Sequence, residues 1–181
     1  MNSIVDKPML QNVSPTASNF DVLDLCHRET IFALGKLAAV MTALQTRGAD
    51  DEVRALAAEV VRHFSTMARE HHQDEERHIF PKMLESGKPE LVRAVQRLRQ
   101  DHGWLEEDWL ELSAQLDAVA SGQGWYDLDV LREGVSIFIA LSHEHIALEE
   151  SLIYPHARAH LHVSELGEMG REMSARRRVK H

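Results

Sequence analysis

Four long stretches of this chain repeat apolar residues at steps of three and four, and no other feature constrains its fold as much. Such spacing gathers apolar side chains on one stripe of an α-helix, and that stripe must pack against neighbouring helices. We predict four helices and a shorter closing one, at about Asp21–Arg47, Asp51–Glu85, Pro89–Ala120, Asp127–Ala159 and Ser164–Arg177. The inward stripe of the first helix is predicted to comprise Leu23, His27, Ile31, Leu34, Ala38, Met41 and Leu44.

Boundary signals lie between these stretches. Gly48 and Gly87 follow the first and second helices, and glycine favours helix C-termini. Asp50 suits an N-cap, and Pro89 suits the first turn of a helix. Because the connections are short, consecutive helices should run antiparallel. The predicted fold class is all-α, an up-down antiparallel four-helix bundle over residues 19–160, with an irregular N-terminal arm at 1–18 and a short C-terminal fifth helix with a basic tail at 161–181.

Polar residues occupy predicted core positions in all four long helices. A buried carboxylate is costly unless it is paired or bound to a metal, and two carboxylates in one core call for positive charge. Metal ions supply that charge, and neutral imidazole is a common metal ligand. The candidate metal ligands are therefore His27, His71, Glu75, His102, His145 and Glu149.

The chain repeats itself around these residues. His71 and His145 are separated by 74 residues, and so are Glu75 and Glu149. The same offset relates the segment from Glu75 to Pro81 to the segment from Glu149 to Pro155. The first and third helices each contribute one core histidine, at His27 and His102. Two helix pairs therefore carry the same chemistry, namely one histidine followed by one His-x-x-x-Glu motif.

The six candidates are predicted to lie in one layer of the bundle. His27 lies about 20 residues before the end of its helix and His71 about 20 after the start of the next, so both sit roughly 30 Å from their shared turn. His102 and His145 each lie about 18 residues from the turn that joins their helices. Residues four apart share a helix face, so each motif can bind one metal through its imidazole while its carboxylate reaches a second.

Four imidazoles and two carboxylates suit iron or manganese, and zinc is also compatible. The single cysteine argues against a structural zinc site. We predict two iron ions, because three protein ligands for each metal leave positions for an oxo or hydroxo bridge and for an exogenous ligand. The absence of an evident substrate-binding insertion favours a small diatomic gas, O2 or NO, as that ligand.

Composition limits the partners and the compartment. The formal net charge of −9 argues against nucleic acid, because no broad basic face is available to neutralise phosphates. No stretch is apolar for long enough to span a membrane, and the N-terminus lacks a signal-peptide pattern. The sequence therefore predicts a cytoplasmic protein without a membrane partner, and it indicates no particular protein partner.

At these residues the chain resembles the hemerythrin-like, or HHE cation-binding, family. The family pattern is a lone His, a His-x-x-x-Glu, a lone His and a second His-x-x-x-Glu on four successive helices. It matches His27, His71 with Glu75, His102, and His145 with Glu149. The resemblance implies a non-haem di-iron site that binds or reacts with O2 or NO, in gas binding, sensing or stress response. It also leaves open a di-iron peroxidase or oxidase and an iron-centre repair or iron-donating factor, so whether the chain is an enzyme stays undecided.

Two positions depart from the oxygen-carrying members of that family. Glu106 stands where those members carry a second histidine on the third helix, and Glu149 follows His145 by four residues where they place an aspartate after five. The periodicity predicts that Glu106 faces inward. Whether Glu106, His72 or Glu76 also binds metal stays open at this stage. Ferritin-like bundles need two Glu-x-x-His motifs, and only Glu75 to His78 has that spacing.

Overall fold

The computed structural model describes residues 19–179, with side chains from 20 to 175, and this part of the chain is helical and contains no strand. The first long helix is α1 (Asn19–Arg47), and the third is α5 (Pro89–Ala120). The second runs through α2 (Asp51–Arg62), α3 (Arg69–Asp74) and α4 (Phe80–Glu85). The fourth runs through α6 (Leu128–Leu148) and α7 (Tyr154–His160), and α8 (Val163–Val179) closes the described chain. The predicted N-terminal arm lies outside the described residues.

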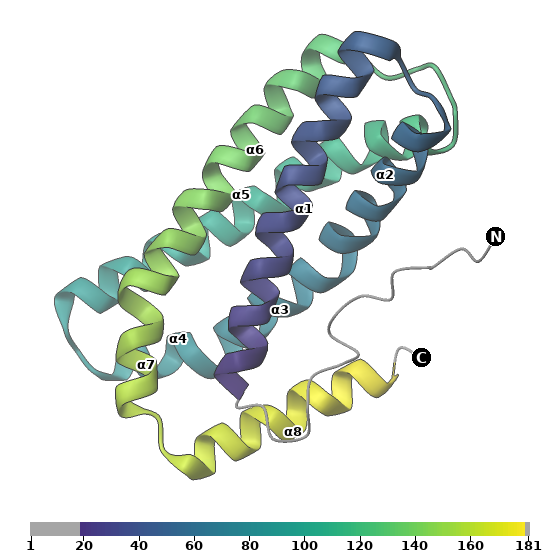
Figure 1. Ribbon diagram of the computed structural model, residues 1–181. Helices are drawn as coiled ribbons and strands as arrows, with labels where there is room; N and C mark the ends of the chain where they lie inside the picture. Colours follow the sequence, from purple (N-terminus) through teal and green to yellow (C-terminus); the bar gives the residue numbers. More distant parts are fainter. Residues whose placement is uncertain (1–18, 180–181) are drawn as a thin grey trace.

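The long helical stretches lie side by side as a bundle (Figure 1). Helix α1 packs against α2 and α6, and α5 packs against the same two helices, so the four segments surround one interior. Helix α8 crosses one end of the bundle and contacts α1 there (Figure 1). None of the helices in residues 19–179 is long and apolar enough to cross a membrane.

The predicted boundary residues end and begin the helices as expected. Gly48 and Gly87 adopt φ values of 77° and 65°, a left-handed conformation that glycine reaches without a Cβ clash. The carboxylate of Asp50 accepts a hydrogen bond from the Val53 amide at 2.9 Å and caps α2. Each predicted helix boundary within the described chain lies within about two residues of the observed one, the usual scatter of helix ends.

Three π-helical segments interrupt stretches that were predicted as continuous α-helix. They are η2 (His63–Ala68), η3 (Glu75–Ile79) and η4 (Glu149–Ile153). The segments η3 and η4 occupy equivalent positions of the internal repeat, and Pro81 and Pro155 follow them in the first turn of α4 and α7. Proline has no N–H to donate and its ring clashes with the carbonyl four residues earlier, so the α-helical ladder is broken just before it. No proline follows η2, and nothing in the local sequence explains it.

One part of the predicted core pattern is wrong. Ile31 is 41% exposed and Ala38 is also exposed, although both were placed on the inward stripe of α1. The prediction advanced by four residues from His27 and from Leu34, whereas the inward stripe advances by three, to the half-buried Thr30 and the buried Leu37. Either step keeps a residue near the same helix face, so periodicity alone did not choose between them.

Two apolar clusters divide the interior. One includes Leu37, Phe64, Trp109, Leu116 and Phe138, at the end of the bundle far from α8. The other includes Leu23, Ile79, Leu98, Ile153 and Met169, at the end of the bundle that α8 crosses. The polar candidates lie along their helices between members of the two clusters. This position excludes bulk water from the polar layer on both sides.

Candidate metal centre

The structure brings all six candidate ligands together. Each is buried, and the most exposed of them, His102, has an exposed fraction of 6%. They form two groups in which one ligand atom of every member lies within 4.8 Å of the others. One group is His27, His71, Glu75 and Glu149, and the other is His102, His145, Glu75 and Glu149. The two carboxylates belong to both groups, the arrangement expected if each reached across to a second metal.

The lone histidines of α1 and α5 are held from behind by carboxylates. His27 Nδ1 lies 3.1 Å from Glu150 Oε1, and His102 Nδ1 lies 2.8 Å from Glu76 Oε1. A carboxylate accepts only, so Nδ1 carries the proton and donates it. When the ring is neutral, its Nε2 lone pair is then left to face the cluster centre, in the tautomer that binds metals.

The two His-x-x-x-Glu motifs place imidazole and carboxylate side by side. His71 Nε2 lies 3.4 Å from Glu75 Oε1, and His145 Nε2 lies 3.1 Å from Glu149 Oε1. Behind His145, Nδ1 faces the buried carboxylate of Asp101 at 3.8 Å. The contacts within the two motifs follow from their i, i+4 spacing, which sets the imidazole and the carboxylate on one helix face.

Many polar atoms of this layer are buried without a hydrogen-bond partner in the described part of the chain. They include Nε2 of His71, His102 and His145, Oε2 of Glu75, and both oxygens of Glu149. Leaving a buried polar atom unpaired costs about 1–3 kcal/mol, and more for a charged one. Several such atoms converging on one layer fit a metal site, because a cation would satisfy them together.

Electrostatics tie the two buried carboxylates to the imidazoles. Burial and the charge of Glu149 raise the pKa of Glu75. Burial would also raise the pKa of Glu149, but the adjacent positive charges of His145 and His27 hold it well below its usual value. Burial opposes the proton on His145, yet Glu149 and Asp101 outweigh it and raise the pKa of His145 to about 10. Without metal, protons therefore take the place of the missing positive charge.

His71 behaves in the opposite way. Burial, and then the charge of His27, lower the pKa of His71 well below its ordinary value. Burial and the charges of His102 and His145 do the same to His72. Both rings are therefore neutral near pH 7, which is the state an imidazole needs in order to bind a metal.

Aromatic rings pack on the lone histidines at equivalent positions of the repeat. Phe80 stacks on His102 with ring centroids 5.4 Å apart, and Tyr154 stacks on His27 at 5.0 Å. The Tyr154 hydroxyl also donates to Glu75 Oε1 at 2.5 Å, and it lies 3.2 Å from His27 Nε2. The tyrosine thus closes the His27 side of the layer and orients one of the shared carboxylates.

A pocket of about 300 Å³ reaches the layer from the side where η2, α3, α5 and α6 meet. Its wall is mainly apolar, with Phe64, Leu105, Trp109, Phe138 and Ile146 among its members. His71, His72, His102 and His145 also line it. Small molecules can therefore approach the cluster from this side, along a predominantly apolar surface.

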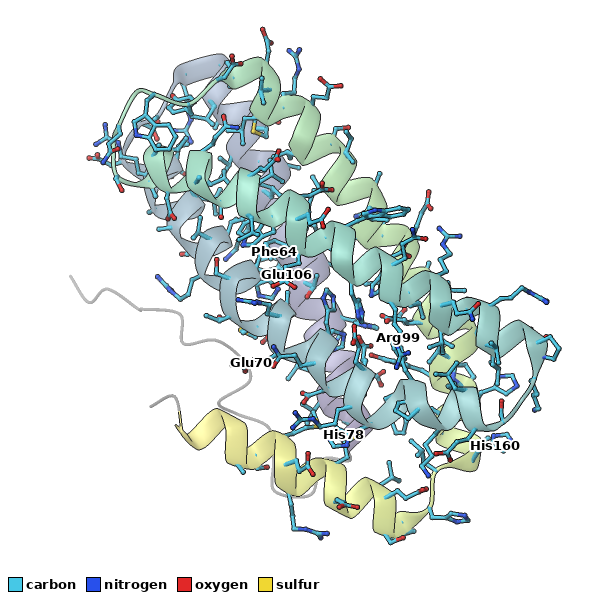
Figure 2. All side chains as sticks on the ribbon, turned by 180° about the vertical axis from the view of Figure 1, so that it is seen from behind. Phe64, Glu70, His78, Arg99, Glu106 and His160 are labelled. Atoms are coloured by element: carbon cyan, nitrogen blue, oxygen red, sulfur yellow. The ribbon has the colours of Figure 1, made fainter. Side chains whose placement is uncertain are left out.

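The prediction that Glu106 faces inward is wrong. Glu106 is 49% exposed and forms an ion pair with Arg69 at 2.6 Å. It lies beside Phe64 at the wall of the pocket, well outside the ligand groups (Figure 2). Its step of four residues from His102 places it at the edge of the inward stripe, where an arginine on the neighbouring helix attracts the carboxylate outward.

The other open positions are also settled in part. Glu76 orients His102 through Nδ1 and joins neither ligand group. His72 lies inside the layer, in a further group with His102 and His145. His78 lies toward α8 (Figure 2), where its Nε2 is 3.4 Å from Glu172.

Sequence reasoning missed three residues that shape this layer: Asp101, Glu150 and Tyr154. The repeat held a signal for Glu150 and Tyr154, because they occupy the positions of Glu76 and Phe80 in the second motif. For Asp101 the signal was its place one residue before the predicted ligand His102. That neighbour relation did not say which other helix it would face.

Fold and site together define a class, a helical bundle with a buried cluster of histidines and glutamates suited to metal ions. The family model for the hemerythrin HHE cation binding domain matches residues 18–157. The chain therefore belongs to the hemerythrin HHE cation-binding family. An uncharacterised protein of Haemophilus influenzae is 32% identical over 160 residues, covering 88% of this chain and 90% of that relative.

Proposed function

We propose that this chain is a non-haem di-iron protein that binds or reacts with O2 or NO, in gas binding, sensing or a stress response. Its up-down antiparallel four-helix bundle would hold one iron at His27 and His71 and the other at His102 and His145. Glu75 and Glu149 would bridge the two metals. Bound ferrous iron would supply the electrons and the open coordination positions that a diatomic ligand needs.

The observation that carries this proposal is the pair of ligand groups that share both carboxylates. Each group offers two imidazoles and two carboxylates, a nitrogen and oxygen set that suits iron or manganese. The carboxylates of Glu76 and Glu150 accept from Nδ1 of His102 and His27 and so fix the tautomers of these two rings, as in many protein metal sites. The chain's own part is to bind and orient the metals and to keep water away.

The approach to the layer supports a small neutral ligand. The pocket wall is mainly apolar, and the buried cluster already carries two carboxylates. A charged substrate would lose its hydration along this mainly apolar wall. A neutral diatomic molecule loses little on entering, which favours O2 or NO over an anionic substrate.

The test is anaerobic loading of the purified chain with ferrous iron, followed by exposure to O2 and, separately, to NO. We expect about two irons per chain by elemental analysis and a change in ultraviolet–visible absorption on exposure to at least one gas. Glu75→Ala/Glu149→Ala, which removes both shared carboxylates, is the matched control and should bind little iron and show no change. An iron-loaded wild-type chain that stays spectrally inert to both gases would contradict the gas-binding function.

A second candidate function is a di-iron peroxidase or oxidase, and the pocket favours it. A volume of about 300 Å³ exceeds what a diatomic ligand needs, since one water occupies about 30 Å³ in the liquid. An enzyme that oxidises a small apolar donor with peroxide would use that space. Steady-state oxidation of a small aromatic donor by the iron-loaded chain, dependent on added peroxide, tests this alternative.

A further inference from the structure

The residue after the motif histidine differs between the two halves of the repeat. In the fourth helix it is Ile146, which is buried and lines the pocket. In the second helix it is His72, which lines the same pocket. The position therefore faces the interior in both halves, and an apolar side chain is enough to fill it. An imidazole there is not required by packing.

The His72 ring lies directly against two metal-ligand candidates. It stacks on His102 with centroids 4.0 Å apart and an angle of 15° between the ring planes. Its centroid lies 5.3 Å from that of His145. One ring nitrogen of each of these three histidines lies within 4.8 Å of the other two.

That spacing nearly meets the demand of a single metal. Imidazole nitrogens bind first-row metals at about 2.1 Å, so two nitrogens on one ion are at most about 4.2 Å apart. To reach one ion, side-chain rotations would have to close this gap and tilt the His72 ring out of its stack on His102, because the in-plane nitrogen lone pairs of parallel rings do not converge.

We propose that His72 is a third imidazole ligand of the metal bound by His102 and His145. This inference rests on the proposed two-metal site and adds a ligand to it, so that five histidines hold the metal pair. The metal at His102 and His145 then has three imidazoles, and the metal at His27 and His71 has two.

Two variants separate ligation from packing. His72→Phe keeps an aromatic ring to stack on His102 but removes both nitrogens. His72→Ile installs the residue that the repeat carries at position 146. His63→Phe is the matched control, because His63 is a half-buried histidine of the same helical stretch that lies outside the ligand groups and bonds to Thr30 at 3.1 Å.

The experiment loads each chain anaerobically with ferrous iron and follows iron release to a coloured ferrous chelator. In both His72 variants we expect one of the two irons to leave at least about 10-fold faster than in the wild type, as loss of a ligand contact predicts, while the other iron and the His63→Phe chain are unchanged. Mössbauer spectra of the same samples should show one altered iron environment and one preserved.

One outcome would contradict ligation by His72, and a different one would contradict the two-metal site. If the wild type binds two irons and a folded His72 variant keeps both its release rates and its Mössbauer spectrum, His72 is not a ligand and the two-metal site stands. If the wild type binds no iron, the two-metal site itself fails.

Discussion

The two halves of the candidate metal centre carry the same candidate ligands, but the residues around those ligands differ. Behind His145 stands the buried carboxylate of Asp101, whereas the repeat places Cys26 at the equivalent position of α1. Over His27 lies Tyr154, whose hydroxyl bonds to Glu75, whereas Phe80 over His102 has no hydroxyl to donate. The histidine at 72 has an isoleucine as its counterpart.

The difference shows how one repeat can build two unequal metal positions. The candidate ligands and the carboxylates that orient the lone histidines are kept in both halves, so both positions suit a cation. The residues that set donor strength and access are not kept. We therefore expect the His102 and His145 position to bind metal more strongly than the His27 and His71 position, because Asp101 makes the His145 imidazole a better donor.

The largest expected effect is the loss of both metals, which would remove the difference between the two halves. Glu75→Ala and Glu149→Ala each remove a carboxylate shared by both ligand groups, so each should deplete both metals together. We expect iron content near zero by elemental analysis, with His78→Ala, a residue outside the groups, close to wild type. His72→Ala should fall between them. Equal loss across all four variants would mean that the ligand set is wrongly assigned.

Acidity should act next most strongly, and with opposite sign on the two forms of the protein. The folded-state pKa of His145 is raised from 6.5 to about 10. In the metal-free chain, the stability that comes from this proton is therefore complete below about pH 6.5 and is lost as the pH rises toward 10. Iron must displace the same proton, so iron affinity should rise over that range.

Thermal unfolding at about pH 6.5 and about pH 9.5 checks both signs. The metal-free chain should melt at a higher temperature at the lower pH, and the stabilisation added by iron should be larger at the higher pH. The variant His145→Gln should remove most of the pH dependence of the metal-free chain. A metal-free chain that gains stability from pH 6.5 to 9.5 would refute the assigned proton.

Asp101→Asn should sharpen the comparison by making the two halves more alike. The variant keeps the size of the side chain but removes the charge behind His145. We expect the affinity for one of the two irons to fall about 10- to 100-fold, the usual cost of losing such a partner. Cys26→Ser, at the equivalent position, is the matched control and should leave both affinities nearly unchanged. Titration against a competing chelator measures them.

The smallest expected effect on metal binding comes from Tyr154→Phe, which copies Phe80 into the second half. The ring can still stack on His27, but Glu75 Oε1 loses its donor. A buried acceptor left unpaired costs about 1–3 kcal/mol, so the metal-free chain should unfold at lower urea concentration. Because iron would also bind Glu75, the loss should be smaller in the loaded chain. An equal loss in both forms would indicate that the tyrosine acts through packing alone.

The sequence determined the helices, their caps and the level of the polar layer. Apolar periodicity located the five helical stretches of residues 19–179, and Asp50, Gly48 and Gly87 marked some of their ends. Counting residues from the shared turns placed six side chains at one height, because the rise per residue of an α-helix is constant. The repeat then related the two motifs without any knowledge of how the helices pack.

Only the tertiary structure decided which neighbours of the ligands face inward. His72 turned into the layer, although a residue one position after the ligand His71 lies about 100° away around a helix. Glu106 turned out to Arg69, although its step of four from His102 predicted that it faces inward. Periodicity fixes the angle of a residue about its own helix axis only while the helix stays regular, and the π-helical segment η2 precedes His72. Glu106 lies on the uninterrupted helix α5, where the ion pair with Arg69 of another helix decided its direction. The partnerships of Asp101 with His145 and of Tyr154 with Glu75 join residues of different helices. Such contacts depend on the distance and rotation between helices, which packing sets and no local pattern encodes.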